Sequence, residues 1–284
     1  MIKNPGTNLV IYNDDRLYDL IDGTITGTIV LPAGTTKIRG YIFNQTNLVG
    51  IQIPNTVTRI GDYAFANMPY LENLNIQDVQ NTLTSIGNFA FQNTPKLKVP
   101  LYLPNTTTLG MYSLSQSGFT RIRAFGVNNA TINWAVFNGF ANLEAAEFGE
   151  GVTSITQGRT FQNSALCTLC VMPSTLLTLG PIFGYSSISK CVIKALIPPT
   201  LNIGEDNGIV YYYVYNSAIE TYKITGNWAS RTGRIRPMVD TVAELSDIDT
   251  TQYTIAIVAG DNTGIENLNN FKLYNYTNGE WIEA

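Results

Sequence analysis

Apolar and polar positions along the chain recur with a period of 22 to 26 residues. In the clearest case, the segment VTRIGDYAF at 57–65 returns as LTSIGNFAF at 83–91. Seven copies are visible. Each ends in a phenylalanine or, in one copy, a leucine, at Phe43, Phe65, Phe91, Leu114, Phe137, Phe161 and Phe183. This periodicity predicts a repeat protein over most of the chain.

A second pattern within the copies is an apolar residue followed at +3 and +5 by two more, as in Leu48, Ile51 and Ile53. The +3 and +5 residues share one face of an extended chain, so each copy should contribute one short strand. Strands this short bury an apolar face only when copies stack, which predicts a β-rich repeat solenoid with short helical turns. We expect such a turn from Gly61 to Phe65, with Ala64 and Phe65 pointing inward. The triplet recurs at Leu71, Leu74 and Ile76; Leu143, Ala146 and Phe148; Cys167, Cys170 and Met172; and Ile188, Cys191 and Ile193.

The residue between the second and third apolar positions should point away from the core, so these residues would line one outer face of the sheet. They share no chemistry, and the face is therefore either a recognition surface or a solvated surface that nothing contacts. The positions are Gln52, Asn75, Tyr102, Arg123 and Glu147, followed by Val171 and Val192.

The pattern changes at both ends of the repeats, which predicts four units. Residues 1–27 carry strand-like pieces at 8–12 and 24–30 and should form a cap or docking arm, and the repeats fill 28–210. Residues 211–238 should cap the repeats with a strand at 212–215 and a helix at 217–225, which Ser217 would N-cap, while Trp228 closes the core. The tyrosines at 211–215 could instead stack on sugar rings.

Residues 239–284 should form a small β module, with an alternating strand at 253–258 and a second at 271–276. Asn278-Gly279 between aromatic strands predicts a hairpin. So short a unit cannot cover its own apolar strands, so we expect it to dock on a neighbour or to assemble with copies of itself as a dimer or trimer. The candidate assembly residues are Tyr253, Phe271, Tyr274, Tyr276 and Trp281.

Composition argues against several functional classes. Charged residues make up 13% of the chain and the net charge is −4 without a long basic stretch, so we expect no nucleic-acid partner. The absence of histidine removes the commonest general base and metal ligand, and we expect a non-enzymatic protein without cofactor or metal. The carboxylate pairs Asp14 with Asp15, Glu147 with Glu150, and Glu205 with Asp206 could act catalytically only if they converged in a groove.

Three cysteines, Cys167, Cys170 and Cys191, resemble part of a redox or zinc site. All three occupy apolar positions of the repeat, which predicts small buried hydrophobic residues.

No apolar run approaches the ~18 residues of a membrane span, so no membrane insertion is expected.

The segment IPNTVTRIGDYAF at 53–65 resembles the BspA-like leucine-rich repeat family, and the segment 212–237 resembles the one that commonly ends such arrays. The likeness covers about residues 28–238. It implies a leucine-rich-repeat solenoid used for binding, typically in bacterial adhesion, with no catalytic residues. The family often has cysteine after the Ala-Phe pair, where this chain has Met68, Thr94, Ser117 and Phe140.

The C-terminal TVAEL at 241–245 and YNYTNGEWI at 274–282 are similar to small modules of bacteriophage tail and fibre proteins. This resemblance implies a virion structural protein of a tailed phage, a head or tail fibre component made in the host cytoplasm. Its partners would be other virion proteins and a host surface glycan or protein. The alternative is a cell-surface adhesin, which would need export, and the N-terminus shows no charged leader followed by an apolar run.

Overall fold

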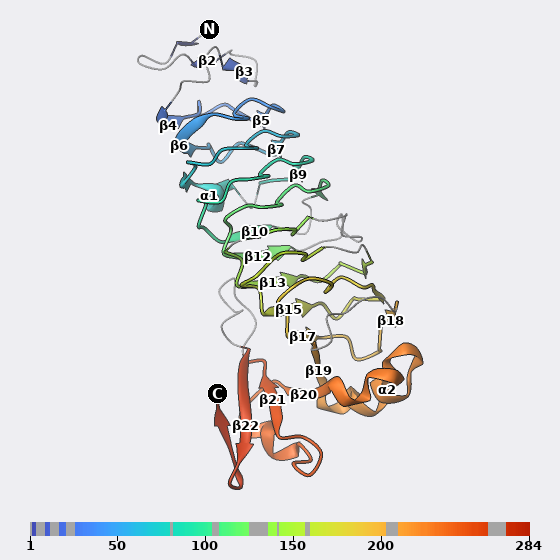
Figure 1. Cartoon of the computed structure of the whole chain (residues 1–284). Coiled ribbons are helices and arrows are strands. Elements are labelled where there is room, and N and C mark those ends of the chain that lie inside the picture. Colours follow the sequence, from blue (N-terminus) through green and yellow to red (C-terminus); the bar gives the residue numbers. More distant parts are fainter. Residues whose placement is uncertain are drawn as a thin grey trace.

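The computed structural model is an elongated stack of short strands, with the N-terminal strands at one end and the C-terminal hairpin at the other (Figure 1). It describes residues 2–3, 9–11, 17–20, 26–79, 82–103, 108–124, 136–140, 142–156, 160–202, 210–260 and 271–284. Strands of successive repeats pair in parallel, one repeat on the next. The predicted β-rich repeat fold with few helices is therefore confirmed.

The longer strands form one three-stranded and one ten-stranded sheet. The three-stranded sheet contains β4 (Thr26–Val30), β6 (Asn47–Gln52) and β8 (Asn73–Leu74). In the ten-stranded sheet the strands follow chain order and are parallel as far as β21, after which β22 and β23 are antiparallel. They are β10 (Leu101–Leu103), β12 (Arg121–Ala124), β13 (Ala145–Phe148), β15 (Leu169–Met172), β17 (Lys190–Ile193), β19 (Tyr211–Tyr215), β20 (Ile235–Val239), β21 (Ile255–Val258), β22 (Lys272–Thr277) and β23 (Glu280–Glu283).

Strands of two residues form two further parallel sheets along the array (Figure 1). One contains β5 (Lys37–Ile38), β7 (Arg59–Ile60), β9 (Ser85–Ile86) and β11 (Thr108–Leu109), and the other contains β14 (Ser154–Ile155), β16 (Thr178–Leu179) and β18 (Thr200–Leu201). At the N-terminal end, β1 (Ile2–Lys3), β2 (Leu9–Ile11) and β3 (Leu17–Leu20) pair antiparallel.

The helices of the described chain are short. They are α1 (Ile76–Val79), α2 (Ile219–Ile224) and the 3-10 helices η2 (Asn216–Ala218), η3 (Gly226–Arg234) and η4 (Ala243–Asp247). The predicted N-cap is wrong, because η2 runs directly into α2 and the cap residue is Ala218, with no side-chain capping bond. Ser217 therefore already lies within a helical turn when α2 begins.

The core is the apolar face predicted from the repeat pattern. Every residue of the five apolar triplets is buried, as are the residues that end each copy. Phe43, Phe65 and Phe91 stack along the interior with ring centroids 5.4 and 5.0 Å apart. Ala64 points inward with Phe65, as expected.

The predicted helical turn from Gly61 to Phe65 is wrong. Tyr63 has a φ of 56° and Asn67 one of 55°, so the backbone makes successive tight turns through the left-handed region. The reason lies in the stacking, because the N–H groups of Tyr63 and Phe65 donate to carbonyls of the next repeat, at 2.9 and 2.8 Å. A helical turn would instead direct these donors along its own axis.

The same turn creates an aromatic row on the surface. Tyr41, Tyr63, Phe89 and Tyr112 all have φ between 52° and 63° and stack with centroids 4.7, 4.7 and 5.2 Å apart. Bulky residues adopt this backbone conformation at a cost of about 1–3 kcal/mol each, which the ring contacts offset in part. The faces of the inner rings are therefore occupied by their neighbours.

Gly87→Ala should destabilise the array by about 1–3 kcal/mol, because the added methyl group would overlap the backbone of the preceding repeat. A Cβ at this position would lie 2.6 Å from the Asp62 nitrogen and 2.7 Å from the Gly61 carbonyl carbon. The matched control is Gly34→Ala, where a Cβ would meet nothing within 4 Å. Urea unfolding of both variants tests the prediction, and equal midpoints would contradict it.

Candidate binding sites

Five of the seven predicted outer-face residues form a row across the ten-stranded sheet. Tyr102 pairs in register with Arg123, Arg123 with Glu147, Glu147 with Val171 and Val171 with Val192. The row changes from polar to apolar at β15. Arg123, Glu147, Val171 and Val192 are all buried, so the face is neither solvated nor open at these four positions.

Arg123 and Glu147 belong to a buried ionic cluster on this face. Arg123 Nε lies 2.7 Å from Glu147 Oε2, and its Nη2 donates to Oε1 at 3.2 Å. Lys194, which follows β17, donates from Nζ to the same Oε1 at 3.1 Å. The Lys194 ammonium also lies 5.7 Å from the centre of the Phe271 ring. The buried Glu147 carboxylate thus contacts both the Arg123 guanidinium and the Lys194 ammonium.

From β15 onward the outer face is a second apolar core. Its buried members include Val171, Val192, Tyr213, Met238 and Ile257, one from each of five consecutive strands. Phe271 and Leu273, at the start of β22, pack against this cluster and are partly buried themselves. The C-terminal strands therefore extend the sheet, and Phe271 and Leu273 join its buried outer face, which argues against a free recognition surface there.

The other predicted face positions lie nearer the N-terminus. Gln52 is exposed, and Tyr102 is half-buried. Asn75 binds its own scaffold, accepting from the Ile53 N–H at 2.6 Å and donating to the Ile53 carbonyl at 2.9 Å. The Asn75 side chain thus makes the two hydrogen bonds that the backbone of a neighbouring strand would make, directly before α1 begins. A binding role for Gln52, Asn75 and Tyr102 stays a prediction.

Of the predicted assembly residues, Tyr274, Tyr276 and Trp281 lie in β22 and β23, whereas Tyr253 and Phe271 lie just before β21 and β22. Tyr253 and Tyr274 are buried, while Phe271, Tyr276 and Trp281 are half-buried. Tyr276 and Trp281 pair across the predicted hairpin, whose turn places Asn278 at φ 55° and Gly279 at φ 91°. Much of this apolar surface is therefore used within the chain, and its role in self-association stays a prediction.

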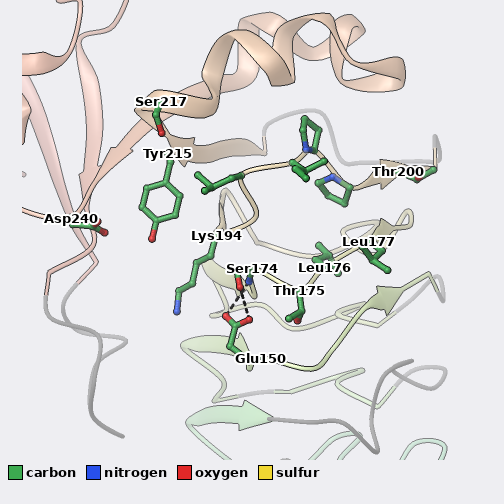
Figure 2. A pocket seen from close by; sticks show the side chains of 14 residues that line it. Glu150, Ser174, Thr175, Leu176, Leu177, Lys194, Thr200, Tyr215, Ser217 and Asp240 are labelled. Atoms are coloured by element: carbon green, nitrogen blue, oxygen red, sulfur yellow. Dashed lines mark hydrogen bonds between the residues drawn. The ribbon is translucent and has the colours of Figure 1, made fainter.

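A groove of about 1050 Å³ lies where the repeats meet the segment after β17 and the strand β19. We call it the junction groove. Figure 2 shows side chains from three repeat levels converging on it. It is lined by Glu150, Ser174, Thr175, Leu176, Leu177, Lys194, Leu196, Ile197, Pro198, Pro199, Thr200, Tyr215, Ser217 and Asp240.

One end of the junction groove is acidic. The pKa of Tyr215 is raised, first of all by burial. The charge of Asp240, the hydrogen bond to Asp240, and the charges of Glu150 and Glu244 raise it further. Glu150 accepts from the Ser174 N–H at 3.0 Å and from the Ser174 hydroxyl at 2.7 Å (Figure 2). These neutral donors fix the Glu150 carboxylate without cancelling its charge. Lys194 adds no free cation, because Glu147 binds its ammonium.

The other end of the junction groove is apolar and open to solvent. Leu177, Leu196 and Ile197 expose 66, 59 and 81% of their surface. Part of the nearby backbone is bonded within the fold, since the Leu177 carbonyl accepts from the Thr200 N–H and the Pro199 carbonyl accepts from the Trp228 indole. Pro198 and Pro199 have no N–H to donate. A ligand at this end would therefore meet exposed aliphatic side chains first.

The candidate catalytic carboxylates do not converge. Glu147 is held by Arg123 and Lys194, whereas Glu150 is held by Ser174 at the groove. Asp14 with Asp15 and Glu205 with Asp206 lie outside the described residues. In the described part of the chain, no cluster of three or more aspartate, glutamate or cysteine side chains could hold a metal ion.

Cys167, Cys170 and Cys191 are fully buried, which confirms that they act as small core residues. Burial raises the pKa of the Cys167 thiol to about 12 and also raises the pKa values of Cys170 and Cys191. Cys170 and Cys191 face one another in register on β15 and β17. A zinc or redox role has no support from this arrangement.

The buried thiols should be unreactive in the folded protein, because only the thiolate attacks a disulfide reagent. We expect almost no reaction with a thiol-specific chromogenic reagent at pH 8, and three equivalents after denaturation. The raised folded-state pKa of Cys167 also implies that its contribution to stability is complete below pH 9 and decreases as the pH rises from 9.0 towards 12. Rapid labelling of native protein would contradict this prediction.

Comparison with known proteins supports the repeat assignment. A family model for the BspA type leucine rich repeat region matches residues 23–124 and 78–194, with six copies, and so spans more than half of the chain. No curated protein matches. In the described residues no helix has the length and apolarity needed to cross a membrane. Leucine-rich repeats of this kind generally serve as non-enzymatic scaffolds for protein interaction or adhesion. The chain belongs to the BspA-type leucine-rich repeat family.

Proposed function

We propose that this protein is a non-enzymatic binding protein whose solenoid of stacked repeats presents the junction groove to a segment of another protein. The single observation that carries the proposal is the groove itself. Three of its aliphatic side chains, Leu177, Leu196 and Ile197, are largely exposed within one cavity of about 1050 Å³. An open apolar concavity with a polar rim is the usual signature of an interaction site.

The chemistry of the junction groove defines the segment that fits. The apolar end suits an aliphatic or aromatic side chain, while Glu150 and Asp240 favour a lysine or arginine a few residues away. We expect these two kinds of side chain to supply most of the affinity. The ligand is therefore an extended basic and apolar segment.

Paired substitutions test this function. Ile197→Asp should weaken binding of the physiological partner at least tenfold, because it places a charge where an apolar side chain packs. Leu166→Asp is the matched control, since Leu166 is another exposed aliphatic residue, at 55%, and lies outside the groove. Binding of labelled variants to candidate virion proteins and to host cells provides the measurement. Equal binding by both variants would refute the role of the groove.

For the biological setting, we propose a structural component of a tailed-phage virion, in a head or tail fibre that attaches to the host or joins other virion proteins. The support is the likeness of 241–245 and 274–282 to phage modules. On this proposal the protein is located in the virion. The alternative is a bacterial surface adhesin, supported by the common use of this repeat family. Immunodetection across a density gradient separates the two: signal with phage particles favours the first, and signal with cell envelopes favours the second.

Self-association belongs to the same proposal. The edge strand β23 ends the sheet, and its Ile282 is 53% exposed, which leaves an edge for pairing with a second copy. Light scattering of the full chain should show a dimer or trimer that Ile282→Lys converts to monomer. Deleting 241–284 is a poor test, because it would also remove Ile257, Phe271 and Leu273 from the apolar cluster on the outer face. A monomeric full chain at every concentration would contradict self-association.

A further inference from the structure

The first repeats carry a second groove, of about 440 Å³, whose charge is opposite to that of the junction groove. We call it the cationic groove. It is lined by Lys37, Ile38, Arg39, Gly40, Arg59, Ile60, Gly61, Asp62, Ser85 and Gly87. Three cations and one carboxylate lie here, although the chain as a whole has a net charge of −4. The excess of positive charge is therefore local.

Two of the cations lie side by side. Lys37 on β5 pairs in register with Arg59 on β7, and both side chains are exposed. Residues paired in neighbouring strands are about 5 Å apart, and like charges at this spacing repel one another. The next residue in the row, Ser85 on β9, accepts from Arg59 Nε at 3.3 Å, so it orients the guanidinium without neutralising it.

The carboxylate in the groove, Asp62, is also engaged elsewhere. It accepts from the Asn88 N–H at 2.8 Å and from the Asn88 side-chain amide at 3.4 Å, both in the next repeat. These bonds hold the turn of one repeat to that of the next. These donors are neutral, so Asp62 keeps its charge, but three cations outnumber this one carboxylate. An external anion would therefore be an effective partner for the Lys37 and Arg59 pair.

From these contacts we infer that the cationic groove binds the anionic groups of an acidic polysaccharide. An oxyanion fits between the ammonium of Lys37 and the guanidinium of Arg59, which can donate two parallel hydrogen bonds to it. The Ser85 and Thr108 hydroxyls continue the row along β9 and β11 and suit sugar hydroxyls. Ile38 and Ile60 are buried, so the groove offers no exposed apolar side chain to a protein ligand.

Binding of heparin to the full-length protein tests this inference, with dextran as the neutral polymer. We expect Lys37→Gln with Arg59→Gln to weaken heparin binding at least about tenfold, since two charge-assisted contacts are lost. Lys96→Gln with Lys98→Gln makes the same change in net charge outside the groove and should leave most of the affinity. Circular dichroism would confirm that both double variants remain folded.

Further polymers identify the anionic group. Loss of binding on desulfation of the heparin would assign sulfate, whereas binding of hyaluronan, which carries only carboxylates, would assign carboxylate; both outcomes support the inference. Three results would overturn it: no binding of either polysaccharide at low salt, equal weakening by the two double variants, or binding of inorganic polyphosphate alone. Because the junction groove is left intact, failure here would not affect the proposed protein-binding function.

Discussion

Glu147→Ala is expected to destabilise the protein by about 3–5 kcal/mol, the usual cost of removing one partner from a buried ion pair. Glu147 is the shared acceptor of Arg123 and Lys194, at 2.7 and 3.1 Å, and its side chain is only 4% exposed. Without it, the buried Arg123 and the half-buried Lys194 lose their shared carboxylate. Urea unfolding followed by circular dichroism would measure the loss.

A neighbouring ion pair provides the control. Glu144 and Arg121 are 3.4 Å apart, but the Glu144 side chain is 58% exposed, so solvent screens the pair. Glu144→Ala should therefore cost less than about 1 kcal/mol. If the two alanine variants were equally stable, the buried cluster would have no special role on this face.

A double substitution separates the net contribution of the pair from the cost of breaking it. Arg123→Leu with Glu147→Leu continues the apolar row that Val171 and Val192 begin, and Lys194 is half-buried and can turn towards water. Replacing a buried pair by packed apolar residues is often neutral. We therefore expect the double variant to recover most of the stability that Glu147→Ala loses.

The repeats and their core could be predicted because each signal is local and recurs. Phe65 and its equivalents mark one position per copy, and the apolar triplets are set by the spacing of residues on an extended strand. The three cysteines were placed in the core by the same register. The hairpin at Asn278-Gly279 was predictable for a similar reason, since two adjacent residues determine its turn.

The features that sequence reasoning missed depend on contacts between distant segments. Nothing near Val171 or Val192 indicates that Phe271 and Leu273, about 80 to 100 residues later, pack on the same face. The left-handed backbone at Tyr63 was missed because bulky residues rarely adopt it, and only bonds to the next repeat make it favourable.

The junction groove was missed because its residues come from different repeats and form no motif. One signal was present, the run Leu196-Ile197-Pro198-Pro199, which lies outside the apolar register of the repeats. Apolar residues without a place in the core are candidates for a surface site. The acidic end had no comparable signal, since Glu150 and Asp240 are 90 residues apart.

Trp228→Ala should also cost about 3–5 kcal/mol, because it empties a large fully enclosed site at the end of the core. The indole packs edge-on against Tyr212 and Tyr222, with centroids 5.0 and 5.1 Å away. Its Nε1–H donates to the Pro199 carbonyl at 2.7 Å, beside β18, the last strand of its sheet. Asn227 donates to the Leu201 carbonyl at 2.6 Å, so these two side chains together satisfy the acceptors at this edge.

Conservative variants divide the effect of Trp228 into volume and hydrogen bonding. Trp228→Phe keeps part of the ring but leaves the Pro199 carbonyl without its donor, and should lie between wild type and Trp228→Ala. Tyr222→Phe removes only the hydroxyl that donates to the Ala195 carbonyl at 2.8 Å, and should cost about 1 kcal/mol. Trp281→Ala is the matched control for residue type, because Trp281 is only partly buried in the terminal hairpin. We therefore expect Trp228→Ala to have the lowest midpoint of thermal unfolding among these variants. A lower midpoint for Trp281→Ala would contradict this, because the array would then depend more on its C-terminal strands than on the closure of its core at β18.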